Sequence, residues 1–214
     1  MMKKLSISAC SLGLLALLAS CGNSGKNNEK DSSIDTVMAS NDTVTVVGKE
    51  DSTLTDSPTG MRSGERAVAT IASASGSKVT GTVTFTQAGD NKVKMVLDLD
   101  GAPAGTHGVH LHQNGDCSAA DAASAGPHWN PGKHPHGKRG EGQFHQGDLP
   151  NLTVGADGRG RMETEVEGWT IGGTDTTRNI VNRSIVIHEK ADDYKTQPAG
   201  DSGKRIGCGV IAQQ

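Results

Sequence analysis

Hydrophobic and polar residues alternate along the chain from about Arg66 onward, in short runs separated by turns rich in glycine. A period of two places every second side chain on the same face, which is typical of a β-strand with one buried face. Runs of this kind predict strands at residues 67–72, 81–87, 92–99, 107–112, 152–154, 160–166, 183–188 and 207–211. No long amphipathic helix is predicted. The pattern therefore indicates an all-β fold, an antiparallel sandwich or barrel.

Residues 114–151 interrupt this pattern with a long irregular stretch. Loops of that length are uncommon in compact domains and usually carry function. The chain of 214 residues contains 29 glycines and only 2% aromatic residues. Its core must therefore come mainly from Val, Ile, Leu and Ala, and many positions must lie in tight turns. We predict one loop-rich domain over residues 66–214.

The first 20 residues predict a lipoprotein signal peptide. Lys3 and Lys4 precede an apolar run at residues 5–19 that is too short for a membrane-spanning helix. The run ends on Leu-Ala-Ser-Cys21, which resembles the bacterial lipoprotein cleavage site, where the cysteine becomes the acylated first residue. A plain secretory signal is the alternative. We expect export and a lipid anchor on Cys21, in a bacterial membrane facing the periplasm or the cell surface.

Charge is distributed unevenly. Residues 21–65 hold four basic and eight acidic side chains and few apolar ones, which predicts a disordered tether. Residues 66–214 hold 15 basic and 16 acidic side chains, so this part is nearly neutral. Near-neutrality argues against a nucleic-acid binder with a broad basic face. Any attraction for a charged ligand must be local.

Four cysteines are present, and two of them belong to the export segment. Cys10 leaves with the signal peptide and Cys21 takes the lipid, so Cys117 and Cys208 remain. One disulfide is expected in an exported protein with two remaining cysteines.

All eight histidines fall between residues 107 and 188, most of them in or beside the long irregular stretch. Such a concentration next to Asp148 points to metal binding. His110 and His112 are two residues apart on a predicted strand, so both rings can face one ion while Leu111 faces the core. The remaining histidines are His107, His128, His134, His136, His145 and His188.

Two ligand sets can be composed from these residues. Three histidines and one carboxylate suit tetrahedral zinc, and four imidazoles suit tetragonal copper. The zinc set is His128, His136, His145 and Asp148, and the copper set is His110, His112, His128 and His188. His128 appears in both sets because an imidazole has two nitrogens and can bridge two metals. His134 and His136 compete for one zinc position, and the spacing from His128 favours His136.

Five segments resemble the copper/zinc superoxide dismutase family in order and spacing. They are GVHLH (108–112), SAGPHWNP (124–131), HQGDL (145–149), VIHEKADD (186–193) and GKRIGCGVI (203–211). The match extends over roughly residues 66–214. It implies an eight-stranded antiparallel Greek-key barrel with long metal-binding loops, copper and zinc as cofactors, and the two ligand sets above.

The resemblance also implies an activity and further residue roles. Superoxide is converted to dioxygen and hydrogen peroxide by redox cycling of copper, and the bridging His128 carries a proton to the peroxide. Asp192 matches a carboxylate that links a copper histidine to a zinc histidine, and Arg205 matches an arginine beside the copper channel. Cys117 and Cys208 match an intrasubunit disulfide, and His107 matches a residue that braces the backbone.

The chain also departs from the family. The segment 194–204 looks shorter than in eukaryotic members and lacks their charged steering residues. Dimer contacts cannot be transferred from the family to this chain. A homodimer is predicted, and no residues are assigned to its interface. Two other interpretations fit the same residues: a non-catalytic copper or zinc binder, and a domain of this fold that has lost its metals. Arg205 and Asp192 argue against the first, and the filled ligand positions argue against the second.

Overall fold

The computed structural model describes residues 64–214, which form a ten-stranded sheet and one short 3₁₀ turn, η1 (Ala123–Ala125). The strands are β1 (Arg66–Ser73), β2 (Thr80–Gln87), β3 (Lys92–Asp100), β4 (Gly105–His107), β5 (Val109–His112), β6 (Leu152–Val154), β7 (Gly160–Glu167), β8 (Ser184–His188), β9 (Arg205–Val210) and β10 (Ala212–Gln213). The predicted signal peptide, Cys21 and all but the last two residues of the predicted tether lie outside the described residues. No helix within residues 64–214 has the length and hydropathy to cross a membrane.

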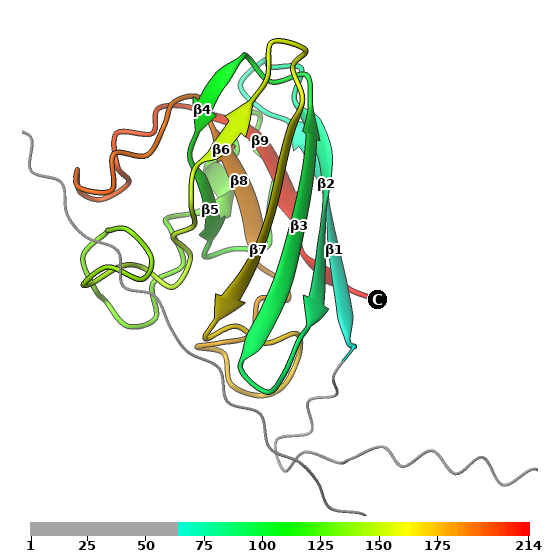
Figure 1. Ribbon diagram of the computed structural model, residues 1–214, viewed down its shortest axis with the longest axis vertical. Helices are drawn as coiled ribbons and strands as arrows, with labels where there is room; N and C mark the ends of the chain where they lie inside the picture. Colours follow the sequence, from blue (N-terminus) through cyan, green and yellow to red (C-terminus); the bar gives the residue numbers. More distant parts are fainter. Residues whose placement is uncertain (1–63) are drawn as a thin grey trace, which may run out of the picture. The chain divides into compact units, whose positions relative to one another are not determined.

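One bent strand closes the sheet into a nearly closed barrel. Antiparallel hydrogen bonding links the strands in the order β4-β6-β7-β3-β2-β1-β9-β8-β5 (Figure 1). β4 and β5 stand at opposite ends of this order, yet only Gly108 separates them in the chain. β4 pairs with β6 and β5 pairs with β8, so the segment from Gly105 to His112 holds both edges together. The connections from β3 to β4 and from β7 to β8 join strands that are not neighbours, as in a Greek key.

The all-β prediction is confirmed, with two differences in detail. The strand predicted at 107–112 is divided because the N–H of Gly108 donates to the carbonyl oxygen of Lys190, outside both sheet edges, at 2.8 Å. The strand predicted at 207–211 begins earlier, at Arg205, and β10 follows it after Ile211. Counting each divided strand once gives the eight strands that the alternation predicts.

The barrel interior contains aliphatic side chains and most of the few large aromatic ones. Along β3 every second residue from Val93 to Leu99 is buried. Phe85, Trp129 and Trp169 are fully buried, and Trp169 stands 6.4 Å, centroid to centroid, from each of the other two rings. The expected core of Val, Ile, Leu and Ala is therefore completed by three aromatic rings.

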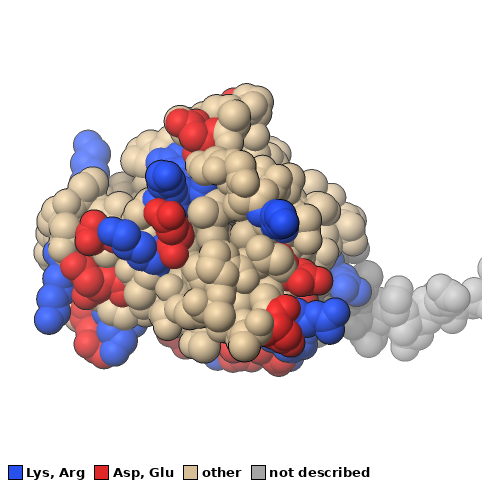
Figure 2. Space-filling model, turned by 90° about the horizontal axis from the view of Figure 1, so that it is seen from above, with Lys and Arg blue, Asp and Glu red and all other residues tan. Residues whose placement is uncertain are grey.

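Charged side chains lie on the outer face of the barrel and pair across strands. On β3, Lys92 and Lys94 contact Glu165 and Glu163 of β7 at 3.3 and 2.5 Å. Acidic and basic side chains are also interspersed on the face seen in Figure 2. Two long segments, residues 113–151 and 189–204, leave the barrel on one side, where Figure 1 shows both as extended loops. They carry most of the residues discussed below.

Candidate metal centre

The long loop is fastened to β5 next to the predicted ligands. The N–H of Leu111 donates to Gly147 O at 2.9 Å, and the N–H of Trp129 donates to Leu111 O at 2.8 Å. A Cβ on Gly147 would lie 2.2 Å from Leu111 O, so this close approach requires glycine. These bonds place the residues that flank Gly147 and Trp129 beside the side chains of β5.

The structure brings the predicted ligands together in two buried groups. The first contains His110, His112, His128 and His188, and the second contains His128, His136, His145 and Asp148. Within each group the potential ligand atoms all lie within 4.8 Å of one another. The groups are those composed from the sequence, and we call them the copper set and the zinc set. His128 belongs to both.

In the copper set, three rings have one nitrogen engaged by an acceptor. His110 Nε2 donates to Asp192 Oδ2 at 2.8 Å, and His112 Nδ1 donates to Gly126 O at 2.8 Å. His188 Nδ1 lies 3.1 Å from the Ser202 hydroxyl. The opposite nitrogen of each ring therefore keeps its lone pair. His112 Nε2 and His188 Nε2 lie only 3.4 Å apart, two acceptors facing each other.

In the zinc set, ring nitrogens gather around one carboxylate. Asp148 lies 2.9 Å from His128 Nδ1 and 3.0 Å from His136 Nδ1. His145 Nδ1 is 3.4 Å from Asp148 Oδ1 and also 3.4 Å from His128 Nδ1. Three nitrogens and one carboxylate oxygen form the donor set that suits zinc.

Two buried ring nitrogens of the copper set, His110 Nδ1 and His128 Nε2, have no hydrogen-bond partner among the described residues. An unpartnered buried polar atom costs about 1–3 kcal/mol, so two of them in one ligand group are best explained by a cation that binds both. In the zinc set, His136 Nδ1 lies 3.0 Å from Asp148 Oδ2, so two potential ligand atoms already face each other there. The donor atoms thus fit both metals that the sequence implies.

Comparisons with known proteins agree with this geometry. The family model of copper/zinc superoxide dismutase matches residues 79–211. The chain belongs to the copper/zinc superoxide dismutase family. As a member of that family it is an oxidoreductase whose cofactors are copper and zinc.

Named relatives support the assignment. A copper/zinc superoxide dismutase of Deinococcus radiodurans is 40% identical over 147 residues, covering 63% of this chain and 78% of the relative. One from Caulobacter vibrioides is 37% identical over 147 residues, covering 66% and 83%. Among solved structures, the crystal structure of the clock protein EA4 has a TM-score of 0.63 at 33% identity, covering 72% of this chain and 98% of that one.

Asp192, the residue that matches the family's linking carboxylate, touches one histidine of each set. Its Oδ2 accepts from His110 Nε2 at 2.8 Å and its Oδ1 accepts from His136 Nε2 at 2.9 Å. A Cβ on Gly200 would lie 1.7 Å from Asp192 Oδ1, so only glycine leaves room for this carboxylate. Asn151 holds the backbone of Asp192 from both sides, accepting from its N–H at 2.9 Å and donating to its carbonyl oxygen at 2.8 Å.

Gln197 holds the backbone of His136 in the same way. Its Oε1 accepts from the His136 N–H at 2.8 Å, and its Nε2 donates to His136 O at 2.9 Å. His136 lies outside every strand, so the amide takes the place of a strand neighbour. This pairing joins the loop at 189–204 to the zinc set.

Burial and neighbouring charges set the protonation of the metal-free site. Burial, followed by neighbouring histidines, holds the pKa of His112 and His188 well below the usual range. Burial lowers the pKa of His128 to about 4, although Asp148 opposes the shift. Burial also acts against protonation of His136, but the carboxylates of Asp148 and Asp192 outweigh it and raise its pKa to about 9.

Asp148 and Asp192 are held in the ionised form. Burial alone would raise the pKa of each carboxyl group. Hydrogen bonds from His128, His136 and His145 reverse the effect at Asp148, and bonds from two histidines do so at Asp192. Both pKa values therefore lie below the usual range for aspartate. Ionised carboxylates beside free imidazole nitrogens complete an electrostatic setting that favours cations.

Arg205 lies beside the copper set at the wall of a cavity of about 780 Å³. The lining includes His112, His128, His188, Gln197, Ser202 and Arg205. The two terminal nitrogens of Arg205 each donate at 2.7 Å, one to Ala122 O and the other to Gly126 O. Because Gly126 O also accepts from His112 Nδ1, one carbonyl joins the arginine to a copper-set ring.

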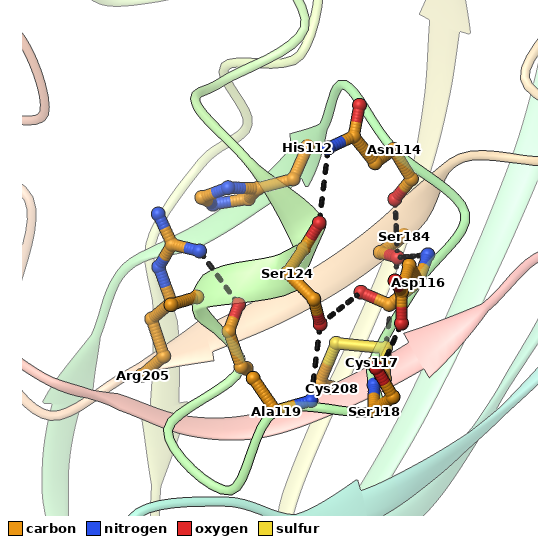
Figure 3. Close-up of a disulfide and its surroundings, with 12 residues drawn as sticks. His112, Asn114, Asp116, Cys117, Ser118, Ala119, Ser124, Ser184, Arg205 and Cys208 are labelled. Carbon is orange, nitrogen blue, oxygen red and sulfur yellow. Dashed lines mark hydrogen bonds between the residues drawn. A yellow bond between two sulfur atoms is a disulfide. The ribbon is translucent and has the colours of Figure 1, made fainter.

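The predicted disulfide between Cys117 and Cys208 is confirmed, with 5.8 Å between the Cα atoms (Figure 3). It joins the start of the long loop to β9. Ser124 orders the same segment, because its hydroxyl donates to Asp116 O and accepts from the N–H of Ala119, both at 3.1 Å. The disulfide thus fixes the loop segment that contains Ala122 and Gly126, whose carbonyl oxygens accept from Arg205.

The two remaining histidines lie outside both groups. His134 is exposed, and its backbone pairs with the Asn130 side chain. The structure therefore brings His136, and not His134, to the zinc set. His107 is buried, with its ring nitrogens 2.8 Å from His188 O and 2.8 Å from Pro103 O. This position agrees with the bracing role that the family resemblance implies.

Sequence reasoning missed several residues that hold the site. Arg139 donates from Nε to Asp148 O at 2.7 Å and from Nη2 to Gln146 O. Its guanidinium lies 4.9 Å from the Phe144 ring centroid, and burial lowers its pKa to about 10. In the sequence, Arg139 reads as one charge in a polar loop. Asn151, Gln197 and Ser202 were missed for the same reason, because ordinary polar residues in loops give no local signal.

Proposed function

We propose that this enzyme disproportionates superoxide at the copper set, with the zinc set holding the shared ring of His128. The observation that carries the proposal is the position of His128 in both ligand groups, with Nε2 on the copper side and Nδ1 on the zinc side. A storage protein needs no ring common to two sites. Bound copper would supply one-electron redox chemistry that turns two superoxide ions into dioxygen and peroxide, and bound zinc would supply charge without redox.

The residues of the chain contribute binding, orientation and proton transfer. Arg205 attracts the anion to the cavity wall, since its guanidinium is charged at all working pH values and fixed by two carbonyls. Asp192, Gly126 O and Ser202 orient the rings of the copper set through the nitrogens that face away from it. When His128 Nε2 is not bound to metal, it holds the proton that is delivered to the peroxide, while Nδ1 stays on the zinc side, 2.9 Å from Asp148 Oδ1.

A turnover assay on the full chain in detergent, loaded with copper and zinc, tests this proposal. We expect dismutation by the wild type. His188→Ala should lose activity and keep its zinc, because His188 belongs only to the copper set. His136→Ala should lose zinc, and the matched variant His134→Ala should keep both metals and activity. A wild type that binds both metals without turnover would instead identify a non-catalytic metal binder.

We also propose that Cys21 carries lipid and anchors the enzyme to a bacterial membrane, facing the periplasm or the cell surface. The support is the apolar run that ends on Leu-Ala-Ser-Cys21 after two lysines. Cys21→Ser should abolish partition of the protein into the detergent phase, whereas Cys10→Ser should leave it unchanged. A wild-type protein that stays in the aqueous phase, with a free amino group on Cys21, would contradict the anchor. A homodimer stays a prediction.

A further inference from the structure

A buried side-chain hydroxyl touches the ring of His188 on the side away from the copper set. Ser202 is 2% exposed, and its Oγ lies 3.1 Å from His188 Nδ1. The other two copper-set rings with an engaged outer nitrogen use a carboxylate and a backbone carbonyl, at Asp192 and Gly126. Only His188 uses a hydroxyl, which can either donate or accept.

A second contact decides the direction of this hydrogen bond. The Ser202 hydroxyl donates to Ala199 O at 2.8 Å. A hydroxyl has one proton, so its oxygen can only accept from the imidazole. The Nδ1 of His188 therefore carries the ring proton, and Nε2 keeps the lone pair that faces the copper set.

Backbone hydrogen bonds hold Ser202 beside His188. The N–H of Lys190 donates to Ser202 O at 2.9 Å, and the N–H of His188 donates to Gly108 O at 2.9 Å. Gly108 also lies against the serine, because a Cβ on Gly108 would stand 3.1 Å from Ser202 Cβ. The hydroxyl is thus set by three neighbouring segments rather than by a free loop.

We propose that Ser202 is the positioning residue for His188: its hydroxyl receives the Nδ1 proton and fixes both the tautomer and the angle of the ring. The competing acceptor is Gly203 O, which lies 3.4 Å from His188 Nδ1, at the long limit for a hydrogen bond. The inference rests on the proposed copper set, to which it adds the role of a residue outside both ligand groups.

The tautomer can be measured directly by nitrogen-15 NMR of the histidine rings in the metal-free full chain. Wild type should show His188 protonated at Nδ1, with that proton protected from exchange. In Ser202→Ala the proton should exchange at least tenfold faster, or the ring should populate both tautomers. A His188 ring that is unchanged in tautomer and exchange would assign the acceptor to Gly203 O and overturn the proposal.

Copper binding supplies the second readout. After loading with copper and zinc, Ser202→Ala should bind copper(II) about 10- to 100-fold more weakly, with an altered electron paramagnetic resonance spectrum and unchanged zinc content. Unchanged copper affinity would likewise overturn the proposal. The matched control is Ser184→Ala, since Ser184 is a buried serine on β8 whose hydroxyl donates to Asn114 O at 2.6 Å. It should leave the His188 ring and the copper spectrum unchanged.

The two readouts separate this inference from the proposed function. A wild type that binds copper but does not turn over superoxide contradicts the function, and the NMR comparison still decides the role of Ser202. A wild type that binds no copper at His188 contradicts the ligand set and overturns the inference with it.

Discussion

Replacing Asp192 with asparagine tests the link between the two metal sets. The carboxylate accepts three hydrogen bonds: from His110 Nε2 at 2.8 Å, from His136 Nε2 at 2.9 Å and from the N–H of Tyr194 at 2.7 Å. An asparagine of the same shape offers one acceptor oxygen and one NH₂ group. In either orientation the NH₂ group faces an imidazole N–H, so one ring must turn away from its present position.

The size of the effect follows from the role of such outer partners. Loss of a group that orients a metal-bound histidine typically lowers metal affinity about 10- to 100-fold, which corresponds to roughly 1.4–2.7 kcal/mol. We expect Asp192→Asn to lose at least tenfold in affinity for one of the two metals. Because the sets share His128, the other metal should also be held less tightly.

Competition with a chelator of known affinity measures both constants, with copper and zinc quantified separately. Asp193→Asn is the matched control, because Asp193 is the exposed neighbour whose side chain accepts from Lys195 and Thr196 and contacts no histidine in the described structure. Equal copper and zinc affinities for Asp192→Asn and wild type would refute the link between the sets.

Three further predictions concern the disulfide, the substrate and pH. Replacing both Cys117 and Cys208 by serine should lower the free energy of unfolding by about 4–5 kcal/mol on the chain-entropy model, and a loss below 1 kcal/mol in denaturant titration would contradict it. Arg205→Ala should slow dismutation about tenfold, and Arg205→Glu should give a rate that rises with salt where the wild-type rate falls; equal salt slopes would exclude steering by this arginine. Burial lowers the pKa of His128 to about 4 in the metal-free protein, so between pH 6.5 and pH 4 the unfolded chain binds a proton there and the folded protein does not. The free energy of unfolding is therefore highest above pH 6.5 and falls as the pH falls towards 4. This loss amounts to about 3 kcal/mol for His128 alone, and His112 and His188 add to it because burial lowers their pKa as well. Denaturant titrations of metal-free protein that agree at pH 7 and pH 4 would contradict it.

Strands could be predicted because their signal is local. Alternation located β3 and β7 to within a residue of their observed ends. The same signal could not show that the strand carrying His110 changes partners at Gly108. A change of partner alters hydrogen bonding but leaves the alternation of side chains intact.

The ligand sets could be predicted because histidine is rare and the family motifs fix its spacing. The residues that hold the ligands could not, because their partners lie far along the chain. Gln197 pairs with a residue 61 positions away, and Asn151 pairs with one 41 positions away. Amides and hydroxyls are common in solvated loops, so only the closed fold distinguishes these from the others.

The strand that closes the barrel also carries His110 and His112, and this affects the order of events during folding. The two edges of the sheet meet at β4 and β5, and His110 and His112 stand beside His188 only while β5 is paired with β8. His188 reaches β5 only when β8 has paired with it, across a gap of more than 70 residues in the chain. Contacts of such long range form slowly, because a long loop must be closed first. Copper bound at this seam would stabilise the folded state over the unfolded one, and copper loss should therefore coincide with local opening of the barrel between β5 and β8.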